Sequence, residues 1–511
     1  MENLADQQVR VRFAPSPTGG LHLGGVRTVL FNYLFAKKYN GQFILRIEDT
    51  DQSRFVPGAE KYILDTLAWC GLTPDESPIH GGAYGPYRQS ERKPMYKQYA
   101  LQLIEQGNAY YAFDTADELD TKRKEIPNFQ YNRATRIGMK NSLSLPAAEV
   151  TRLLNENTPH VVRINMPDSE ELVFEDLIRG EVKFDTSMVD DKVLLKADEM
   201  PTYHLAVVVD DFLMKITHAF RGEEWLPSAP VHILVWKNLF GLDKMPQWAH
   251  LPLILKPDGN GKLSKRDGDR LGFPVFAMDW TDPNTKEPTI GFKERGFLPE
   301  AFVNLLAMLG WNDGTDQELF SLATLIEKFS LDRVHKGGAK FDYEKAKWFN
   351  QEWIKQADNT YLANLVAPYF EAAKIEIHEP SYLVKVIGLV KERCQLLNDF
   401  IPQSSFFFNA PTEIDTVSIL PKWDLAKAAF FTLVMEAYSN QAVPNDAILL
   451  ETHFKTLAAE QGLKPGDLML PFRIMLVGGK FGPGVFDIVA NIETQDAAKR
   501  IQYCLDLLSK N

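Results

Sequence analysis

The hydrophobic pattern opens with a strand, a loop, a helix and a second strand. Apolar residues alternate with arginines over 9–13, which predicts a strand, and they recur at helical spacing over about 24–34. A proline- and glycine-rich loop at 15–20 separates these two elements, and 43–47 is a second apolar strand. This order is a βαβ unit, which implies a parallel sheet whose ligands bind beyond the carboxyl ends of the strands.

The rest of the pattern divides the chain into regions of different character. Strands are predicted at 161–165, 172–174, 204–209 and 215–220, and 251–255 is a further apolar run. Helices are predicted at 301–309, 321–329, 382–400 and 425–438. We therefore expect a multidomain fold, α/β plus all-α. Its parallel-sheet part carries an insertion of mixed α+β character at about 87–201, and the region from about 342 to 511 forms one or two all-helical domains.

Composition and charge narrow the class of protein. The 511 residues are 45% hydrophobic and 24% charged, which is typical of globular chains and excludes disordered and collagen-like ones. Lysine and arginine number 56 against 68 acidic residues, a net charge of −12, so any contact with RNA must use local basic patches.

Cysteine usage and the absence of long apolar runs indicate the compartment. The three cysteines, Cys70, Cys394 and Cys504, are too far apart for a disulfide framework or a Cys-x-x-Cys zinc site, and they fit a reducing compartment. Residues 1–8 form no apolar signal segment, and no apolar run reaches the roughly 20 residues that cross a bilayer. We expect a cytoplasmic protein with no membrane segment.

The first candidate motif is the string PSPTGGLHLGG at 15–25, here called the signature loop. Its glycines allow close approach of the backbone, and free amides at the start of the following helix attract anions. His22 is suited to donate a hydrogen bond to a phosphate oxygen. The alternative for the His-x-Gly triplet alone is an ordinary turn with a structural histidine; the whole string is more specific.

The second motif is the basic loop KLSKR at 262–266, which follows two glycines. Its three cations suit a triphosphate whose charge must be neutralised as it is displaced. A solvated basic loop is the alternative reading when this loop is taken alone. We expect the basic loop and the signature loop to face one ligand.

A third group consists of Arg12, Glu48, Tyr203 and Arg221, which fall at or near predicted strand ends. Arginine binds carboxylates with a two-pronged geometry, so this group is suited to hold a small dicarboxylic amino acid. A surface ion-pair network is the alternative. We expect Arg12→Ala and Arg221→Ala each to abolish activation of that amino acid without unfolding the chain.

The order and spacing of these blocks resemble those of bacterial glutamyl-tRNA synthetases, which are class I enzymes. The matching strings are RFAPSPTG at 12–19, RIEDTD at 46–51, GPYRQSER at 85–92, PTYHL at 201–205, RGEEW at 221–225, KLSKR at 262–266 and GFLPEA at 296–301. The resemblance runs from about residue 11 to the C-terminus and implies a Rossmann-type catalytic domain with an acceptor-binding insertion and a helical anticodon-binding region. The implied domains are 1–87 and 203–258 (the two catalytic halves), 88–202 (insertion), 259–341 (phosphate loop and stem contact) and 342–511 (anticodon-binding region).

The resemblance also implies roles for individual residues. The catalytic residues would be His22, Lys262 and Lys265. The glutamate-binding residues would be Arg12, Ser16, Glu48, Tyr203 and Arg221. The ATP-binding residues would be Pro15, His22, Gly24, Gly25, Leu263, Ser264, Lys265 and Arg266. The tRNA-binding residues would be Lys122, Arg123, Arg133 and Arg393.

The family reaction joins L-glutamate to tRNA(Glu) in two steps. The α-carboxylate attacks the α-phosphorus of ATP, pyrophosphate leaves, and the 2′-hydroxyl of the terminal adenosine of the tRNA then attacks the glutamyl-adenylate. ATP would act as a substrate with Mg²⁺, and the family suggests a monomer. The first step needs charge neutralisation and alignment more than a general base.

Two stretches and one single residue depart from the family pattern. Some members bind zinc in the insertion through cysteines, whereas this chain has YYAF at 110–113, so we predict no zinc. The stretch 271–291 is longer than usual, and a surface insertion is the simplest interpretation. Val207 stands where some relatives carry a polar asparagine, so we do not carry over the substrate contact of that asparagine to this position.

Four other functions share part of this pattern. A glutaminyl-tRNA synthetase, or a non-discriminating enzyme that also charges tRNA(Gln), is the nearest, although glutaminyl enzymes usually have a β-barrel anticodon region. A short paralogue that glutamylates a modified tRNA base would lack the C-terminal helices. A small-molecule nucleotidylyltransferase would not need the insertion or those helices, and a non-catalytic RNA-binding protein would not need His22, Lys262 and Lys265 together.

Overall fold

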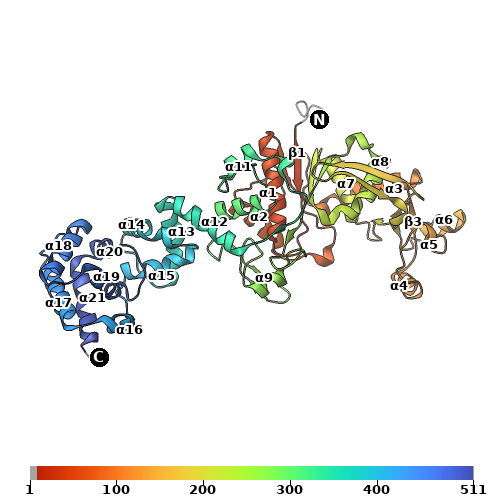
Figure 1. Cartoon of the computed structure of the whole chain (residues 1–511). Coiled ribbons are helices and arrows are strands. Elements are labelled where there is room, and N and C mark those ends of the chain that lie inside the picture. Colours follow the sequence, from red (N-terminus) through yellow and green to blue (C-terminus); the bar gives the residue numbers. More distant parts are fainter. Residues whose placement is uncertain (1–7, 510–511) are drawn as a thin grey trace. The chain divides into compact units, whose positions relative to one another are not determined.

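The computed structural model of the chain describes residues 8–509. Within this range, residues 8–294 and 299–343 form one compact unit, and residues 295–298 and 344–509 form a second. Residues 1–7, on which the expectation about the N-terminal segment mostly rests, lie outside the described residues. Figure 1 shows the elements of both units in the order of the chain.

The first unit is built on the parallel sheet that the sequence predicts. Among the described residues this sheet has the strand order β2-β1-β8-β9-β5-β6, and only the edge strand β6 runs antiparallel. Its strands are β1 (Arg10–Phe13), β2 (Gln42–Leu45), β8 (His218–Gly222), β9 (Gln247–Leu251), β5 (Glu171–Asp176) and β6 (Gly180–Asp185). The α/β fold class is thereby confirmed. The hairpin β5–β6, which belongs to the sequence region read as an insertion, extends this sheet.

Helix α1 (Leu23–Lys38) begins within the signature loop and includes its last three residues. His22 is its N-cap, and the imidazole Nδ1 accepts a hydrogen bond from the Gly24 amide at 3.2 Å. The helix packs on β1, beside which it lies in Figure 1, and buries most of its apolar residues. The cap therefore fixes where α1 begins within the signature loop and which way the first amides of this helix point.

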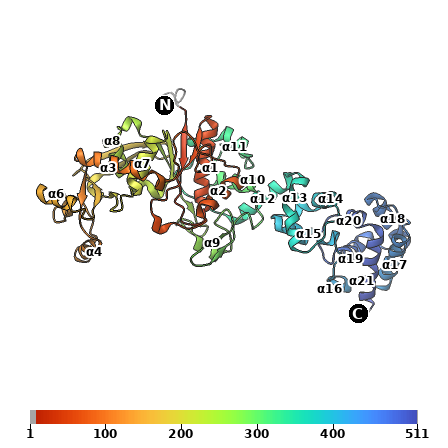
Figure 2. The ribbon, with the colours of Figure 1, turned by 180° about the vertical axis from the view of Figure 1, so that it is seen from behind.

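Residues 203–213 form helix α7 (Tyr203–Leu213), so the strand predicted at 204–209 is wrong. The run LAVVV at 205–209 is apolar enough for a buried strand, and a short apolar run does not separate a strand from a buried helix by periodicity. Here α3 (Lys93–Glu105) and α8 (Ala229–Leu239) pack on α7, as Figure 2 shows, and bury these side chains. Tertiary packing overrides the strand preference of valine.

A smaller antiparallel sheet supports the insertion. It consists of β3 (Ala109–Ala112), β4 (Val161–Ile164) and β7 (Val193–Leu195). Buried Asp191 ties it together, because its carboxylate accepts hydrogen bonds from the Tyr110 hydroxyl at 2.6 Å and from Arg136 at 3.0 Å. The Arg163 guanidinium donates to the Asp191 backbone carbonyl and lies 4.0 Å from the centre of the Tyr131 ring. The stretch read as lacking zinc ligands is thus part of a buried polar network.

The remaining elements of the first unit are short. The helices are α2 (Ala59–Trp69), α4 (Ala116–Glu125), α5 (Arg133–Arg136), α6 (Ala147–Asn155), α9 (Lys265–Leu271), α10 (Pro299–Met308) and α11 (Leu322–Lys328). Strand β10 (Ile254–Leu255) pairs with β13 (Ala339–Lys340), and β11 (Trp280–Thr281) pairs with β12 (Pro288–Thr289). The last pair lies inside the long stretch 271–291.

The second unit is helical, as the sequence predicts. Its helices are α12 (Tyr343–Gln356), α13 (Asn359–Ala372), α14 (Pro380–Val390), α15 (Phe400–Ser404), α16 (Thr416–Ile419), α17 (Leu425–Ser439), α18 (Ala447–Glu460), α19 (Pro465–Val477), α20 (Val485–Ile492) and α21 (Thr494–Leu508). The helix predicted at 382–400 is too long, since α14 ends at Val390 and short 3₁₀ turns follow. Buried Cys394 lies between these turns and not in a helix.

No helix in the described part of the chain combines the length and the apolar character needed to span a membrane.

A buried ion network joins the sheet to α7. Asp211, near the end of α7, accepts hydrogen bonds from Arg12 Nε at 3.1 Å and from Arg46 Nη1 at 2.8 Å. The preceding residue, Asp210, accepts from Arg92 Nε at 2.6 Å. All these side chains are at most 5% exposed. Such pairs are costly to break, because the remaining partner is left buried and charged.

We expect Asp211→Asn to lower the free energy of unfolding of the first unit by about 3–5 kcal/mol, since Arg12 and Arg46 would lose their shared carboxylate. Urea unfolding followed by circular dichroism measures this change. Asp65→Asn, which removes the exposed pair with Lys61, is the control and should change the same quantity by about 0.5 kcal/mol or less. Equal effects of the two substitutions would contradict the structural role of the network.

Candidate active site

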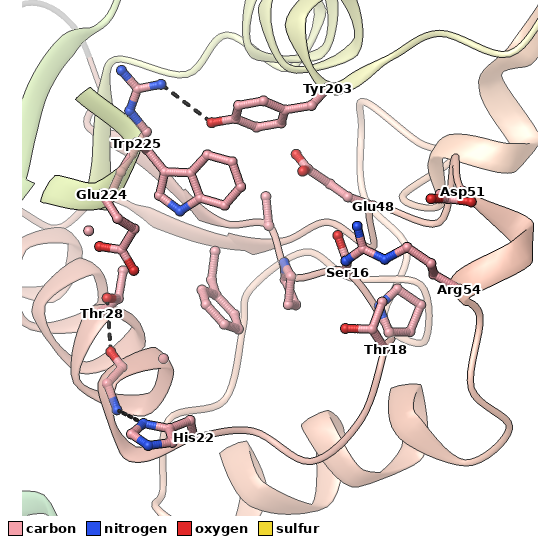
Figure 3. A pocket seen from close by; sticks show the side chains of 18 of the residues that line it. Ser16, Thr18, His22, Thr28, Glu48, Asp51, Arg54, Tyr203, Glu224 and Trp225 are labelled. Carbon is pink, nitrogen blue, oxygen red and sulfur yellow. Dashed lines mark hydrogen bonds between the residues drawn. The ribbon is translucent and has the colours of Figure 1, made fainter. Parts of the chain in front are cut away.

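One large cavity, here called the main cavity, opens at the carboxyl edge of the sheet and has a volume of about 1300 Å³. It is lined by the signature loop, the segment after β2, the start of α7 and the segment after β8. Figure 3 shows Glu48 and Tyr203 on one side of this cavity and His22 and Thr28 on another. The sequence-predicted residues that line it are Arg12, Pro15, Ser16, His22, Gly24, Gly25, Glu48, Tyr203, Arg221, Lys262, Leu263 and Ser264.

Arg12 reaches the cavity from β1 while bound to Asp211. Its Nη1 group also donates to the Phe220 carbonyl at 3.4 Å, and the residue is 4% exposed. The guanidinium is therefore held by the fold itself. This structural role differs from the expectation that Arg12 could be removed without unfolding the chain.

Glu48 follows β2 and lies in the cavity wall with its side chain 9% exposed. Its carboxylate accepts a hydrogen bond from Arg46 Nη2 at 3.2 Å. Burial raises the pKa of Glu48 to about 7, because the loss of hydration outweighs the attraction of Arg46 and Arg12. A cationic ligand beside Glu48 would therefore stabilise the charged form of its carboxylate.

Arg221, at the end of β8, is held differently from Arg12. Its Nη1 group donates to the Tyr203 hydroxyl at 3.4 Å, the bond drawn in Figure 3, and its guanidinium carbon lies 4.4 Å from the centre of the Trp248 ring. Its Nε and Nη2 groups are buried and have no hydrogen-bond partner among the described residues, and it pairs with no carboxylate there. A buried guanidinium in this state fits an anionic ligand.

His22 presents a neutral donor to the cavity. Its Nδ1 accepts the amide hydrogen of Gly24, so in the neutral ring the proton sits on Nε2. Burial lowers the pKa of His22 to about 4, with a smaller contribution from nearby Lys262, so the ring is neutral at neutral pH. The Nε2 atom is buried and has no partner among the described residues. It is placed to donate a hydrogen bond to an oxygen of a ligand in the main cavity.

The basic loop divides between two cavities. Lys262 lines the main cavity and pairs with Glu224. Lys265 is the first residue of α9 and lines a side cavity of about 380 Å³, where its Nζ lies 3.7 Å from a Glu287 oxygen. The two cavities share Pro15, Ser16 and Thr18 in their walls. In this structure Lys265 therefore does not face the same space as His22, because the helix start turns it toward the stretch 271–291.

The other predicted cations lie away from both cavities. Arg266 lines neither of them. In the insertion, exposed Lys122 pairs with Glu125, Arg123 with Asp120, and Arg133 with Asp168. Arg393 lies in the second unit, in a 3₁₀ turn after α14. Exposed pairs of this kind contribute little to stability.

The stretch 271–291 packs on the signature loop. The Leu23 amide donates to the Val275 carbonyl at 2.9 Å, and the Tyr62 hydroxyl donates to the Met278 carbonyl at 2.6 Å. The Trp280 ring meets the Tyr62 ring edge-on, with 5.3 Å between their centres. The stretch is thus more than a surface insertion, since it forms one wall of the side cavity.

Sequence reasoning missed several residues that line the main cavity. They are Arg27, Thr28, Thr50, Asp51, Gln52, Arg54, Lys196, Asp198 and Trp225, among others. Most of them follow β2 directly or precede α7. Their position next to predicted site residues was the available signal. Val207 is buried within α7 and does not line the cavity.

The GPYRQSER block at 85–92 does not line the main cavity, but it holds two nearby carboxylates in place. Gln89 donates to the Asp210 carboxylate at 2.8 Å, as Arg92 does. The Ser90 hydroxyl donates to Asp49 at 2.6 Å. This block therefore fixes a cavity-lining carboxylate and the end of α7.

Two family models together match most of the chain. The model for class I tRNA synthetases (E and Q), catalytic domain, matches residues 8–348. A model for an anticodon binding domain matches residues 361–505.

Curated relatives and solved structures match over nearly the full length. A glutamate–tRNA ligase of Phocaeicola vulgatus is 49% identical, covering 99% of this chain and 100% of its own, and one of Christiangramia forsetii is 50% identical, covering 98% and 99%. A crystal structure of a glutamate tRNA ligase from Elizabethkingia meningosepticum in complex with its amino acid has a TM-score of 0.94 at 45% identity, covering 98% of this chain and 100% of that one. The glutamate-tRNA synthetase structure from Elizabethkingia anophelis has a TM-score of 0.92 with the same identity and coverage.

We expect Glu48→Gln to raise the melting temperature at about pH 8. The pKa of Glu48 is raised on folding, so between the unfolded value and about 7 the folded chain binds more protons, and stability falls as pH rises through that window. Glutamine carries no charge to bury. Thermal unfolding should show the largest gap between variant and wild type at about pH 8 and a smaller gap at about pH 5. A variant that is less stable than the wild type at the higher pH would contradict the raised pKa.

Proposed function

Because the chain belongs to the bacterial glutamate–tRNA ligases, within the class I tRNA synthetases, we propose that its main cavity binds glutamate and ATP side by side. The enzyme uses ATP to activate L-glutamate and transfers the glutamyl group to tRNA. The assignment to cavity residues is carried by one observation: a buried arginine, Arg221, that pairs with no carboxylate among the described residues lies across the cavity from a neutral histidine at a helix start.

The glutamate side of the cavity combines both signs of charge. Arg221 is proposed to bind the side-chain carboxylate through the two N–H groups that lack partners. Glu48, whose carboxylate is costly to bury alone, is proposed to bind the α-ammonium group together with the Tyr203 hydroxyl. Ser16 and Arg12 complete the proposed pocket. The neutral amide of glutamine would leave the Arg221 charge unpaired, so this pocket favours glutamate.

The ATP side of the main cavity is formed by the signature loop and the start of α1. His22 Nε2 and the amides at the start of α1 are proposed to donate to phosphate oxygens. Lys262 is proposed to exchange Glu224 for a phosphate. Lys265 and Arg266 are proposed to reach the phosphates only after α9 moves, because Lys265 now lines the side cavity. Mg²⁺ is proposed to arrive bound to the phosphates, and Glu224, on the same side of the cavity as His22, offers the oxygen ligands that it prefers (Figure 3).

The chemistry needs alignment and no nucleophilic side chain. An oxygen of the glutamate α-carboxylate forms a bond with the α-phosphorus of ATP while the bond to pyrophosphate breaks. The 2′-hydroxyl oxygen of the terminal adenosine then bonds to the glutamyl carbonyl carbon, AMP leaves, and the hydroxyl proton is released. His22 and Lys262 stabilise charge on the phosphates in the first step, which is the main catalytic contribution available in phosphoryl transfer.

The cations of the insertion and of the second unit are proposed to hold the tRNA. Lys122, Arg123 and Arg133 would release their exposed carboxylate partners to bind acceptor-end phosphates, and Arg393 would contact the anticodon arm. The family resemblance further supports a monomer that acts in the cytoplasm.

Arg221→Ala should raise the KM for glutamate at least about 100-fold, since a buried charge-assisted bond is lost, while the melting temperature changes little. Charging of purified tRNA(Glu) with labelled glutamate, dependent on ATP, measures this and also tests the proposed function. Wild-type enzyme should charge with glutamate and not with glutamine. Arg12→Ala is the comparison and should lower both activity and melting temperature, because it breaks the pair with Asp211. Normal kinetics of Arg221→Ala would refute the role of Arg221.

Gly24→Ala should raise the KM for ATP several-fold and leave the fold intact. A Cβ atom at Gly24 would meet no atom closer than His22 Nδ1 at 3.7 Å, so the backbone does not require glycine there. Gly24 does line the main cavity, where the added methyl group would occupy the proposed ATP cradle. Pyrophosphate exchange at varied ATP concentration tests this. An unchanged KM for ATP would place the nucleotide elsewhere.

A further inference from the structure

Histidine side chains lie behind Arg221, outside the main cavity. His232, on α8, is 1% exposed, and its Nδ1 lies 3.1 Å from Arg221 Nη1. His250, on β9, occupies the register position next to Arg221 on the neighbouring parallel strand. Neither histidine lines the main cavity. Neither histidine therefore contacts a ligand in the main cavity directly.

The contact between Arg221 and His232 has a defined direction. A guanidinium has only donors, so His232 Nδ1 must be the acceptor and must carry no proton. The ring is then the neutral tautomer with its proton on Nε2. Burial and the nearby charge of Arg221 hold the pKa of His232 well below its ordinary value, in agreement with this tautomer.

The environment of His232 fixes the ring in place. The Tyr203 ring lies edge-on to it with 5.0 Å between centres, and the His204 ring lies 5.4 Å away. On β9, the strand next to β8, His250 Nδ1 forms a hydrogen bond of 2.6 Å with the Asp176 carboxylate. The same carboxylate also accepts from the backbone amides of Ile178, Arg179 and His250. The hydrogen bonds of Asp176 are thus directed to His250 and to backbone, and none goes to Arg221.

This arrangement differs from that of Arg12 and Arg46. Arg12 and Arg46 are both oriented by Asp211, which neutralises much of their charge. Arg221 is oriented by a neutral imidazole and a tyrosine hydroxyl. A carboxylate at position 232 would orient Arg221 equally well, but it would form an internal ion pair that competes with an incoming anion.

We propose that His232 is a positioning residue for glutamate selection: its neutral Nδ1 orients Arg221 without cancelling the positive charge that the side-chain carboxylate of the substrate requires. This inference rests on the proposed function. It predicts that the charge of the group at position 232, more than its size, sets the affinity for glutamate.

Three substitutions separate charge from shape. His232→Asn places an amide oxygen near the position of Nδ1 and should change the KM for glutamate by about threefold or less. His232→Leu removes the acceptor and should raise this KM about tenfold. His232→Asp supplies a paired carboxylate and should raise it about 100-fold, with a fall in the preference for glutamate over glutamine. The KM for ATP should stay within about twofold of the wild type in all three, since His22 and the signature loop are untouched.

The measurement is steady-state charging of tRNA(Glu) at varied glutamate, glutamine and ATP, with thermal unfolding of each variant. His218→Asn, another buried histidine on β8 that does not line the main cavity, is the control for loss of a core imidazole and should leave the KM for glutamate unchanged. Equal KM values for His232→Asn and His232→Asp, or parallel changes in the KM for ATP, would overturn the inference. A wild-type enzyme that does not charge tRNA with glutamate would instead refute the proposed function, so the two failures are distinguishable.

Discussion

The arrangement of the main cavity depends on one buried carboxylate, Asp211, shared by two arginines from neighbouring strands. Arg12 on β1 and Arg46 after β2 both donate to it, and it lies near the end of α7, whose first residue is Tyr203. Three elements that are far apart in the chain are thereby fixed relative to one another. Both ends of α7 then contribute to the cavity, one through Tyr203 and the other through the orientation of Arg12.

The same network explains why two arginines in one cavity have different roles. Arg12 is bound by a carboxylate of the fold, whereas Arg221 is bound by neutral groups and by the face of Trp248. Glu48 is a buried group of the opposite charge. The attraction of Arg46 and Arg12 does not fully offset the hydration that its carboxylate loses on burial. A substrate that carries a carboxylate and an ammonium group relieves both conditions at once. Stability and binding are therefore in opposition at Glu48.

Much of this was readable in the sequence, and the failures have physical causes. The βαβ unit and the two loops were predicted from the hydrophobic pattern and from the rule that ligands bind beyond the carboxyl ends of parallel strands. Most residues that the family resemblance assigned to glutamate and ATP do line the main cavity. Residues 204–209, which lie within helix α7, were predicted as a strand because valine is common in strands. Packing against α3 and α8 buries this run in a helix instead. The structural role of Arg12 depends on Asp211, 199 residues later. The turn of Lys265 into the side cavity depends on the cap of α9 by Ser264, which pattern reasoning did not consider.

The attachment of the insertion has a structural consequence. The chain enters the insertion past Gln89 and Arg92 and leaves it into α7, and all of these meet at Asp210. The base of the insertion is thus joined to α7 by buried hydrogen bonds. The next residue of α7, Asp211, holds the guanidinium of Arg12 in the wall of the main cavity. Two neighbouring carboxylates at one end of a single helix therefore connect the insertion with the main cavity.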